Sequence, residues 1–333
     1  MIRAAIVGLG RWGRTLVNAV QGHSEVLRFV QAIDTAPQAA QAFCDQHGMP
    51  LAADLGVALR DPQVQAIVLV TPHSLHREQV EACARAGKHV FCDKPLALER
   101  ADAAAMVQAC AQAGVVLGVG HNRRFWPSTQ AIAQMVAAGE LGQLLHIEGH
   151  NSNENSNQVL GGWRTQASES PGGGMTGSGL HALDTMIGLA GPVRQVHATL
   201  TGFREALPPL DTATASLRFA NGMSGLLTTI RATPLFWRIH LFGTRASAEA
   251  LGAHELVVRR SGSAPERIAL PVRDAERDQL EAFAAAVAGH APFPVTPAQM
   301  LDTVSAFEAV IASMRVGETV AIDEAFSTPR QPD

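Results

Sequence analysis

The first 34 residues constrain the fold of this chain more than any other stretch, because they predict a strand, a glycine turn, a helix and a second strand. The apolar run at 4–7 leads directly into the sequence GLGRWG at residues 8–13. Apolar residues with helical spacing follow, and a second apolar run at 29–33 ends at Asp34. This order is typical of the first βαβ unit of a doubly wound parallel sheet that binds a dinucleotide.

Each glycine of the turn has its own role if a dinucleotide binds here. Gly8 permits the sharp turn, Gly10 lets a pyrophosphate approach the backbone, and Gly13 lets the helix pack close to the strand. The helix start offers N–H groups and the positive end of its dipole to phosphates. Asp34, about 20 residues further on, suits the ribose hydroxyls and repels a 2′-phosphate. We therefore expect NAD, with NADP disfavoured; a glycine turn that binds no nucleotide is the alternative.

Composition argues against several classes of protein. The net charge is −4 and no basic block of five residues occurs, which argues against nucleic acid or an anionic membrane as a partner. No apolar run reaches the ~18 residues of a spanning helix, and no signal peptide precedes the first strand. The four cysteines form no CxxC pair or Cys/His cluster, so we expect no metal site and a cytoplasmic protein with reduced thiols. A tyrosine general base is excluded because the chain has no tyrosine.

The hydrophobic pattern predicts an α/β protein of two domains. Strands alternate with helices in the first part, which predicts a Rossmann-type parallel sheet over residues 1–124. Period-two runs separated by turn signals then predict an α+β domain with an open-faced antiparallel sheet over 125–326, whose last helices are able to pack back on the first domain. The first domain is expected to have strands at 4–7, 29–33, 66–70, 89–92 and 115–119 and helices at 37–47, 77–86 and 101–113. The second is expected to have strands at 144–149, 196–202, 212–219, 223–230, 237–242 and 256–259 and helices at 128–138, 179–189, 278–287 and 297–314.

The predicted parallel strands end in loops that carry reactive side chains, at the edge where open α/β sheets bind ligands. The loop 71–76 follows one strand, and Asp93 and Lys94 follow the next. A lysine beside a nicotinamide donates to a substrate oxygen, or acts as a base if burial and nearby positive charge lower its pKa. An ordinary surface lysine is the alternative for Lys94.

Two later segments add charged and titratable side chains. Asn122, Arg123 and Arg124 follow the last strand of the first domain, where they suit a phosphate, a carboxylate or a polyhydroxylated substrate. A bracing role is the alternative for either arginine. The glycine run at 172–179 leads into a helix with His181, a residue that accepts protons near neutral pH. A hydrogen-bonded core histidine is the alternative for His181.

Several motifs, in order along nearly the whole chain, resemble those of the Gfo/Idh/MocA family of oxidoreductases. The matching segments are GLGRWG, VTPHSLH, AGKHVFCDKPLAL, GHNRRF, GGGMTGSGLHALD and VTPAQMLDTVSAFEAVIASMRVGETV. The resemblance implies a Rossmann domain followed by an open-faced sheet domain. It also implies hydride transfer between NAD(P) and a secondary alcohol of a sugar, polyol or related ring. Members of the family form dimers or tetramers through the open sheet, so we expect a homo-oligomer.

The resemblance also assigns catalytic residues, with one departure. The family uses a lysine, an aspartate and a histidine four residues after that aspartate. Lys94 and His181 match, but the aspartate position falls on Gly177, and Asp93 replaces the usual glutamate before the lysine. The nearby carboxylates that offer a substitute are Asp184 and Glu154. Asp184 is three residues after His181, and a local bracing role is the alternative for it.

These considerations give a complete expected site. The residues expected to contact the cofactor are Gly8, Gly10, Arg11, Trp12, Gly13, Asp34, Thr71, Pro72, His73, His76, Asp93, Lys94 and Asn122. The residues expected to contact the substrate are Arg123, Arg124, Trp163, Arg164 and Asp184, with Lys94 and His181 as the catalytic pair. The Asn-rich segment 151–157 is a polar loop near the cleft, or only solvated. Three functions follow: an NAD-dependent dehydrogenase of a sugar or polyol, a dehydrogenase of a cyclic or carboxylated diol, or a catalytically silent NAD-binding sensor.

Overall fold

The computed structural model describes residues 1–153, 163, 166–202, 212–231 and 233–322. The chain divides into two compact units. Unit 1 combines Met1–Asn122 with Asp274–Pro297, and unit 2 combines Arg123–Arg273 with Ala298–Asp333. The division after Asn122 lies two residues before the predicted boundary, and a later helix returns to the first unit.

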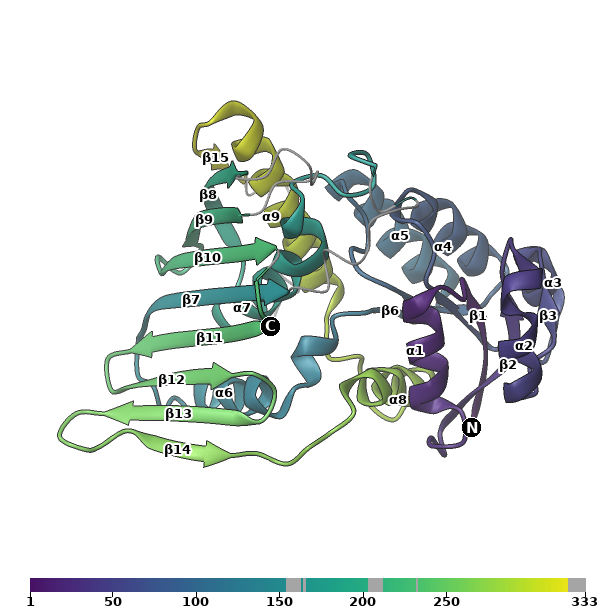
Figure 1. Cartoon of the computed structure of the whole chain (residues 1–333), viewed down its shortest axis with the longest axis horizontal. Coiled ribbons are helices and arrows are strands. Elements are labelled where there is room, and N and C mark those ends of the chain that lie inside the picture. Colours follow the sequence, from purple (N-terminus) through teal and green to yellow (C-terminus); the bar gives the residue numbers. More distant parts are fainter. Residues whose placement is uncertain (154–162, 164–165, 203–211, 232, 323–333) are drawn as a thin grey trace. The chain divides into compact units, whose positions relative to one another are not determined.

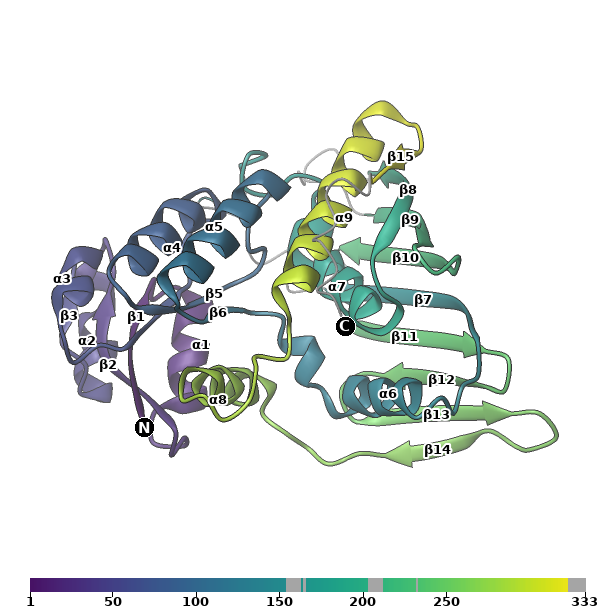
Figure 2. The same cartoon turned by 180° about the vertical axis from the view of Figure 1, so that it is seen from behind.

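Unit 1 contains a six-stranded sheet in the order β3-β2-β1-β4-β5-β6, and every neighbouring pair is parallel. Helices α4 and α5 lie on one face of the sheet and α1 and α8 on the other (Figures 1 and 2). The predicted doubly wound sheet is therefore confirmed. The strands are β1 (Ile2–Val7), β2 (Leu27–Ile33), β3 (Leu51–Ala52), β4 (Ala66–Leu69), β5 (His89–Cys92) and β6 (Leu117–Val119). The helices are α1 (Arg11–Val20), α2 (Pro37–His47), α3 (Leu55–Arg60), α4 (His76–Arg85), α5 (Arg100–Ala113) and α8 (Ala275–Val287), with a short 3-10 turn, η1 (His73–Leu75).

The strand order of unit 1 reverses between β1 and β4. Ligands of open α/β sheets bind outside the carboxyl ends of the strands at such a reversal. The glycine turn follows β1, and the loop that begins at Thr71 follows β4, so both predicted cofactor loops belong to this switch point.

Helix α8 completes the core of unit 1 although it lies more than 150 residues from the rest of the unit. Its Phe283 is fully buried, and its ring packs edge-on against Phe91 of β5 with 5.6 Å between the ring centroids. A Cβ at Gly118 of β6 would lie 3.0 Å from both rings, so a glycine is needed there. Burial of large apolar side chains of this kind is the main stabilising contribution to such a layer.

Unit 2 is built on a nine-stranded sheet in the order β14-β13-β12-β11-β7-β10-β9-β8-β15, with α6, α7 and α9 along one face (Figures 1 and 2). The sheet is antiparallel as predicted, except that β7 and β10 pair in parallel. The long connection from β7 through α7, β8 and β9 allows that direction. The strands are β7 (Leu144–Asn153), β8 (Val193–Thr201), β9 (Thr212–Phe219), β10 (Ser224–Arg231), β11 (Phe236–Gly243), β12 (Ala246–Leu251), β13 (Glu255–Arg260), β14 (Glu266–Ala269) and β15 (Val320–Ala321). The helices are α6 (Pro127–Ala137), α7 (Leu180–Ala190) and α9 (Pro297–Val316), with η2 (Asn122–Phe125) and a π-helical segment, η5 (Met175–Gly179).

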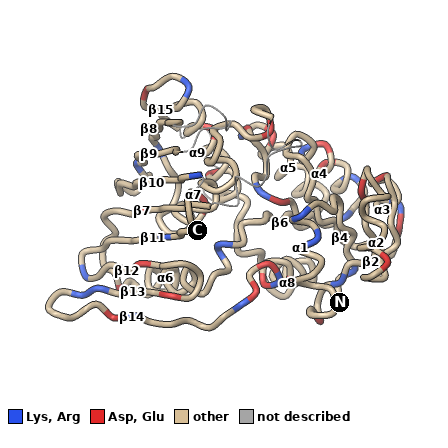
Figure 3. Tube along the Cα trace, viewed as in Figure 1, with Lys and Arg blue, Asp and Glu red and all other residues tan. Residues whose placement is uncertain are grey.

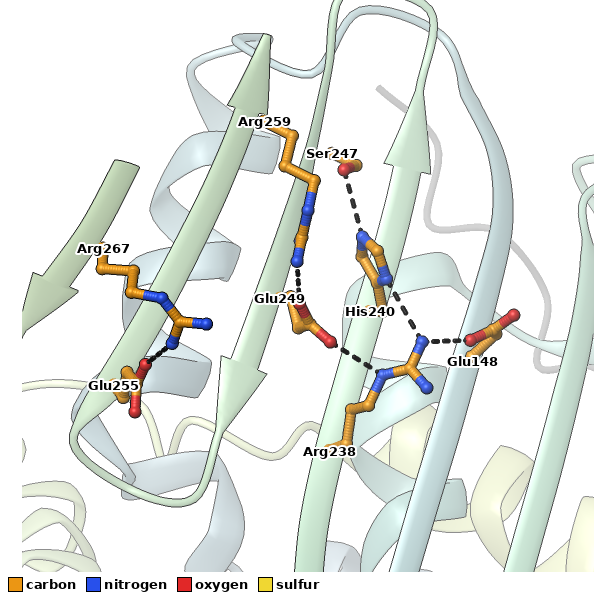
Figure 4. A network of polar contacts seen from close by, with 8 residues as sticks. All are labelled: Glu148, Arg238, His240, Ser247, Glu249, Glu255, Arg259 and Arg267. Atoms are coloured by element: carbon orange, nitrogen blue, oxygen red, sulfur yellow. Dashed lines mark hydrogen bonds and ion pairs between the residues drawn. The ribbon is translucent and has the colours of Figure 1, made fainter. Parts of the chain in front are cut away.

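The two faces of this sheet differ in chemistry. A Cβ at Gly149 of β7 would lie 2.6 Å from the sulfur of Met186 in α7, so Gly149 faces the helices. Because side chains alternate along a strand, Glu148 and its register partner His240 point to the other face. There Arg238 binds Glu148 and Glu249, and Glu249 also binds Arg259 (Figure 4). Charges of both signs occur along β12 to β14 (Figure 3).

Candidate functional site

The glycine turn between β1 and α1 leaves space at one glycine and none at the other two. Gly8 has a φ of +94°, and a Cβ there would lie 2.5 Å from the carbonyl oxygen of Val70. A Cβ at Gly13 would lie 2.0 Å from the oxygen of Gly8. Among the described residues, nothing lies within 4 Å of the Cβ position of Gly10. The turn thus packs tightly on one side and is open beside Gly10, where a pyrophosphate would approach.

This difference predicts separable effects of two alanine substitutions. Gly13→Ala is expected to destabilise unit 1, because the methyl group meets backbone atoms that cannot move aside. Gly10→Ala is expected to leave the melting temperature within about 2 °C while weakening NADH binding at least tenfold, a loss of about 1.4 kcal/mol. Thermal unfolding and fluorescence titration with NADH measure the two effects. Unimpaired NADH binding by a folded Gly10→Ala protein would contradict the prediction that the pyrophosphate approaches the turn beside Gly10.

Asp34, at the end of β2, is bound to the same turn. Its Oδ2 accepts a 2.7 Å hydrogen bond from the N–H of Leu9, and its Oδ1 accepts a 2.8 Å bond from the N–H of Ala36. Arg14 reinforces the turn by donating from Nε to the oxygen of Leu9 at 3.0 Å. The half-buried carboxylate is therefore held beside the glycine turn, in the place expected for a ribose-binding acid.

The loop that carries Lys94 begins at the carboxyl end of β5. The N–H of Asp93 donates to the oxygen of Leu69 at 2.9 Å, which continues the pairing of β5 with β4. The indole Nε1 of Trp12 donates to Oδ1 of Asp93 at 3.1 Å. Lys94 is half-buried and follows directly. Thr71, Pro72 and His73, also half-buried, follow the neighbouring strand β4.

Lysine is rare in this protein, and one of the two lysines has a specific structural role. The chain has two lysines and twenty-four arginines. The Nζ atom of Lys88 donates to the oxygens of Asp61 and Val64, both at 2.7 Å, and the residue is 8 % exposed. A compact ammonium fits between those two carbonyls, whereas a planar guanidinium does not. Lys94 is the other lysine, so a chain that otherwise uses arginine as its long cation keeps an amine in the candidate site.

Two residues predicted to touch the cofactor are instead buried in protein contacts. His76 has no exposed surface; its Nδ1 lies 3.0 Å from the oxygen of Pro95, and its Nε2 lies 3.1 Å from the oxygen of Thr71. Burial lowers the pKa of His76, while the charge of Asp93 opposes that shift. Asn122 is 2 % exposed and donates from Nδ2 to Glu276 at 2.9 Å. Both ring nitrogens of His76 face backbone oxygens, and Nδ2 of Asn122 is bound by α8. Cofactor contacts by these two residues stay predictions.

Unit 2 places His181 in the first turn of α7, directly after the π-helical segment η5. The segment is anchored to β7 because Nδ2 of Asn151 donates to the oxygen of Ser178 at 2.8 Å. Gly177 is exposed, and in the described part of the chain no heavy atom lies within 4 Å of its Cβ position. No heavy atom of the described residues therefore occupies the Cβ position one turn before His181, where the resemblance to the family implies a carboxylate.

Arg124 and Asp184 were predicted to contact substrate, but they bind each other. Nε and Nη2 of Arg124 donate to the two carboxylate oxygens of Asp184 at 2.7 and 2.9 Å. Thr303 of α9 donates to the same carboxylate at 3.3 Å, and Asp184 has no exposed surface. These contacts fit the bracing role given as the alternative for both residues, and substrate contact by either residue stays a prediction.

The remaining predicted substrate residues have different surroundings. The guanidinium of Arg123 lies 3.8 Å from the ring centroid of Trp126, which itself packs edge-on against Trp237. A guanidinium held over an aromatic ring gains a cation–π attraction. Trp163 is half-buried. Arg164, Glu154 and the end of the Asn-rich segment lie outside the described residues, whereas residues 151–153 belong to β7 rather than to a loop.

The cysteines are buried and unpaired with one another. Burial raises the pKa of Cys83 to about 12 and that of Cys110 to about 11, so these thiols are protonated and unreactive at neutral pH.

In the described ranges, no three His, Cys, Asp or Glu side chains are grouped to hold a metal ion. Among the same residues, no helix combines the length and apolar character needed to cross a bilayer.

Comparison with known proteins agrees with this arrangement. Residues 2–121 match the model of an oxidoreductase family with an NAD-binding Rossmann fold, Gfo/Idh/MocA, and residues 129–249 match the model of the Gfo/Idh/MocA C-terminal domain. The chain belongs to the Gfo/Idh/MocA family. Its membership accounts for both sheets and for the order of motifs along the chain.

Among Gfo/Idh/MocA proteins, several curated relatives match part of the chain. The chain is 38% identical over 141 residues to 4-carboxy-2-hydroxymuconate-6-semialdehyde dehydrogenase of Sphingobium sp., with 42% of this chain and 44% of the relative covered. It is 32% identical over 166 residues to 1,5-anhydro-D-fructose reductase of Ensifer adhaerens, with 47% of each chain covered. The chain thus spans about half the length of these relatives. The uncharacterized oxidoreductase YrbE of Bacillus subtilis is 27% identical over 97% of both chains.

Solved structures share the whole fold. A putative NADPH-dependent oxidoreductase of Desulfitobacterium hafniense has a TM-score of 0.89 at 23% identity, covering 96% of this chain and 97% of that one. Levoglucosan dehydrogenase in complex with NADH and levoglucosan has a TM-score of 0.87 at 20% identity, covering 97% and 100%. At these identities the likeness establishes the fold alone.

Proposed function

We propose that this Gfo/Idh/MocA protein is an NAD-dependent dehydrogenase that moves hydride between the nicotinamide and a secondary alcohol of a sugar, polyol or related ring. The observation that carries the proposal is in unit 1. The tight glycine turn is open beside Gly10, and Lys94 follows a strand of the same sheet on a loop that Trp12 of the turn holds. The retention of an amine in an arginine-rich chain supports a chemical role for Lys94.

The proposed chemistry needs two groups from this chain. His181 accepts the proton of the substrate hydroxyl, and Lys94 donates a hydrogen bond to the same oxygen as it becomes a carbonyl. Bound NAD supplies the hydride acceptor. The assignment of Lys94 and His181 to one alcohol rests on their match to the family's catalytic set.

Asp34 supports NAD rather than NADP. Its two carboxylate oxygens are already fixed by the N–H groups of Leu9 and Ala36, so the charge cannot easily move away from the turn. A 2′-phosphate placed there would meet a fixed negative charge. We expect NADH to bind at least tenfold more tightly than NADPH.

The absence of a side chain at Gly177 favours a second candidate substrate class, a cyclic or carboxylated diol. The family's aspartate would add a negative charge one turn before His181, and this chain has no side chain there. A substrate carboxylate meets less repulsion at such a site. The partial similarity to the carboxy-hydroxymuconate-semialdehyde dehydrogenase is in keeping with this candidate.

We also propose that a second copy of the chain covers the open face of the unit 2 sheet, as in relatives of this family. The face combines acids and bases around Arg238 with aromatic rings such as Phe242, which packs on His240 at 3.8 Å between ring centroids. A face with both charge signs is able to complement a second copy of itself across a two-fold axis. The cytoplasmic location stays a prediction.

A substrate screen combined with binding measurements tests the proposed function. NADH and NADPH affinities come first, by fluorescence titration. NAD reduction is then followed with neutral sugars and polyols in one panel and carboxylated ring diols in another. With the substrate found, His181→Asn is expected to lower kcat by about 10²- to 10⁴-fold, because the amide cannot accept the proton. NADH binding without turnover on any alcohol would favour the silent sensor, and absence of binding would end the proposal.

A further inference from the structure

A hydrogen bond joins the glycine turn to the loop of Lys94 across 81 residues of sequence. Trp12 lies in the first turn of α1, and its Nε1 donates to Oδ1 of Asp93 at 3.1 Å. A bond to an ionised carboxylate is stronger than one between neutral groups. Both ends lie in unit 1, where α1 and β5 belong to one layered structure (Figure 2).

Asp93 is held closely on its other sides. Its N–H is bound to Leu69, and a Cβ at Gly120 would lie 2.9 Å from its Oδ1 and 3.2 Å from its Cα. The carboxylate therefore fills the space between Trp12 and the backbone of Gly120. Movement of the turn must move Asp93 or break the bond.

The other end of the loop is fixed by His76. Its Nδ1 lies 3.0 Å from the oxygen of Pro95 and 3.3 Å from the oxygen of Leu96, while its Nε2 faces Thr71. Lys94 thus stands between two anchored points, of which only the Trp12 anchor leads to the glycine turn. The His76 anchor ties the loop to the neighbouring loop after β4.

We propose that Trp12 and Asp93 are a positioning pair that couples dinucleotide binding at the glycine turn to the placement of Lys94. This proposal rests on the proposed function for the importance of Lys94. Coupling between two sites is reciprocal, so a change at the pair alters both NADH affinity and the surroundings of the amine.

The two lysines of the chain make the coupling measurable without a substrate. An amine-acylating reagent followed by peptide mass spectrometry reports on Lys94, with Lys88 as an internal control that is 8 % exposed. The variants are Trp12→Phe, which removes the donor and keeps an aromatic ring, Asp93→Ala, the double variant, and Asp93→Asn, which keeps an acceptor oxygen. NADH affinity is measured on the same samples.

Trp12→Phe and Asp93→Ala are each expected to weaken NADH binding by about fivefold to twentyfold, as for loss of one bond to a charged group. The double variant is expected to bind NADH no more weakly than the weaker-binding single variant, and Asp93→Asn, which keeps an acceptor oxygen, is expected to lose less affinity than Asp93→Ala. In cofactor-free Trp12→Phe, the pH at which Lys94 is labelled at half its maximal rate is expected to change, because the loop that carries the amine loses one of its two anchors. Labelling of Lys88 is expected to stay unchanged.

The proposed coupling would be overturned if the losses of NADH affinity in the two single variants added in the double variant. It would also be overturned if NADH binding weakened while the labelling of Lys94 stayed native. Either result would mean that Trp12 acts on the cofactor alone. A native protein that binds no NADH would instead refute the proposed function. Titration of the native protein with NADH distinguishes failure of the coupling from failure of the proposed function.

Discussion

Replacement of Lys94 by alanine is expected to reduce kcat by about 10²- to 10⁴-fold, the range for loss of a group that assists proton transfer or holds the reacting oxygen. NADH affinity is expected to remain within about fivefold, because the glycine turn and Asp34 stay intact. Steady-state kinetics on the substrate found by the screen, together with NADH titration, measure the two quantities.

Lys94→Arg sharpens this prediction. Arginine keeps the positive charge, yet its guanidinium does not release a proton at physiological pH and presents a planar fork in place of a compact ammonium. We expect kcat to recover by less than tenfold. Lys88→Met serves as the matched control, since it removes the other lysine; it is expected to lower stability and leave kcat per folded molecule unchanged. Turnover within tenfold of native for Lys94→Ala would refute a catalytic role.

The second large effect is expected at the Arg124–Asp184 pair of unit 2. Asp184→Ala should lower the free energy of unfolding by about 3–5 kcal/mol, because it leaves a guanidinium that is only 12% exposed without its carboxylate. Urea unfolding measures the change. Removal of both charges in Arg124→Leu with Asp184→Leu is expected to recover part of the loss, since no buried charge is then left alone.

A surface pair gives the comparison for this prediction. Arg77 and Asp102 are also 2.7 Å apart, but their side chains are 50% and 39% exposed. Asp102→Ala is therefore expected to change the free energy of unfolding by less than about 1 kcal/mol. Equal effects of Asp102→Ala and Asp184→Ala would contradict the argument from burial.

Local periodicity predicted most of the elements, because each buries one continuous apolar face. The helix at 37–47 and the strand at 212–219 agree with the structure residue for residue. Strand β12 was missed because its sequence, ASAEAL, consists mainly of residues that favour helices and is held extended by pairing with β11 and β13. The parallel pairing of β7 with β10 depends on a long-range connection that no local pattern contains.

In the candidate site, too, some features could be predicted from local sequence and others depend on contacts between distant elements. The glycine turn and the loop of Lys94 could be predicted because strand ends and turn residues are local signals. The partners of Arg124, Asp184 and His76 could not, since each lies on another element. The sequence shows an arginine at position 124 and, in an apolar helix, an aspartate at position 184. These residue types are compatible with an ion pair between two elements as well as with contacts to a substrate.

Helix α8 sets a limit on how this protein is made. Unit 1 needs Phe283 against Phe91 to close its core, so a ribosome must synthesise residue 287, and with it most of unit 2, before the nucleotide-binding half is complete. A fragment that ends at the first division of the chain would expose the apolar surface that α8 covers. We therefore expect the first 122 residues to be less stable alone than when they are joined to α8.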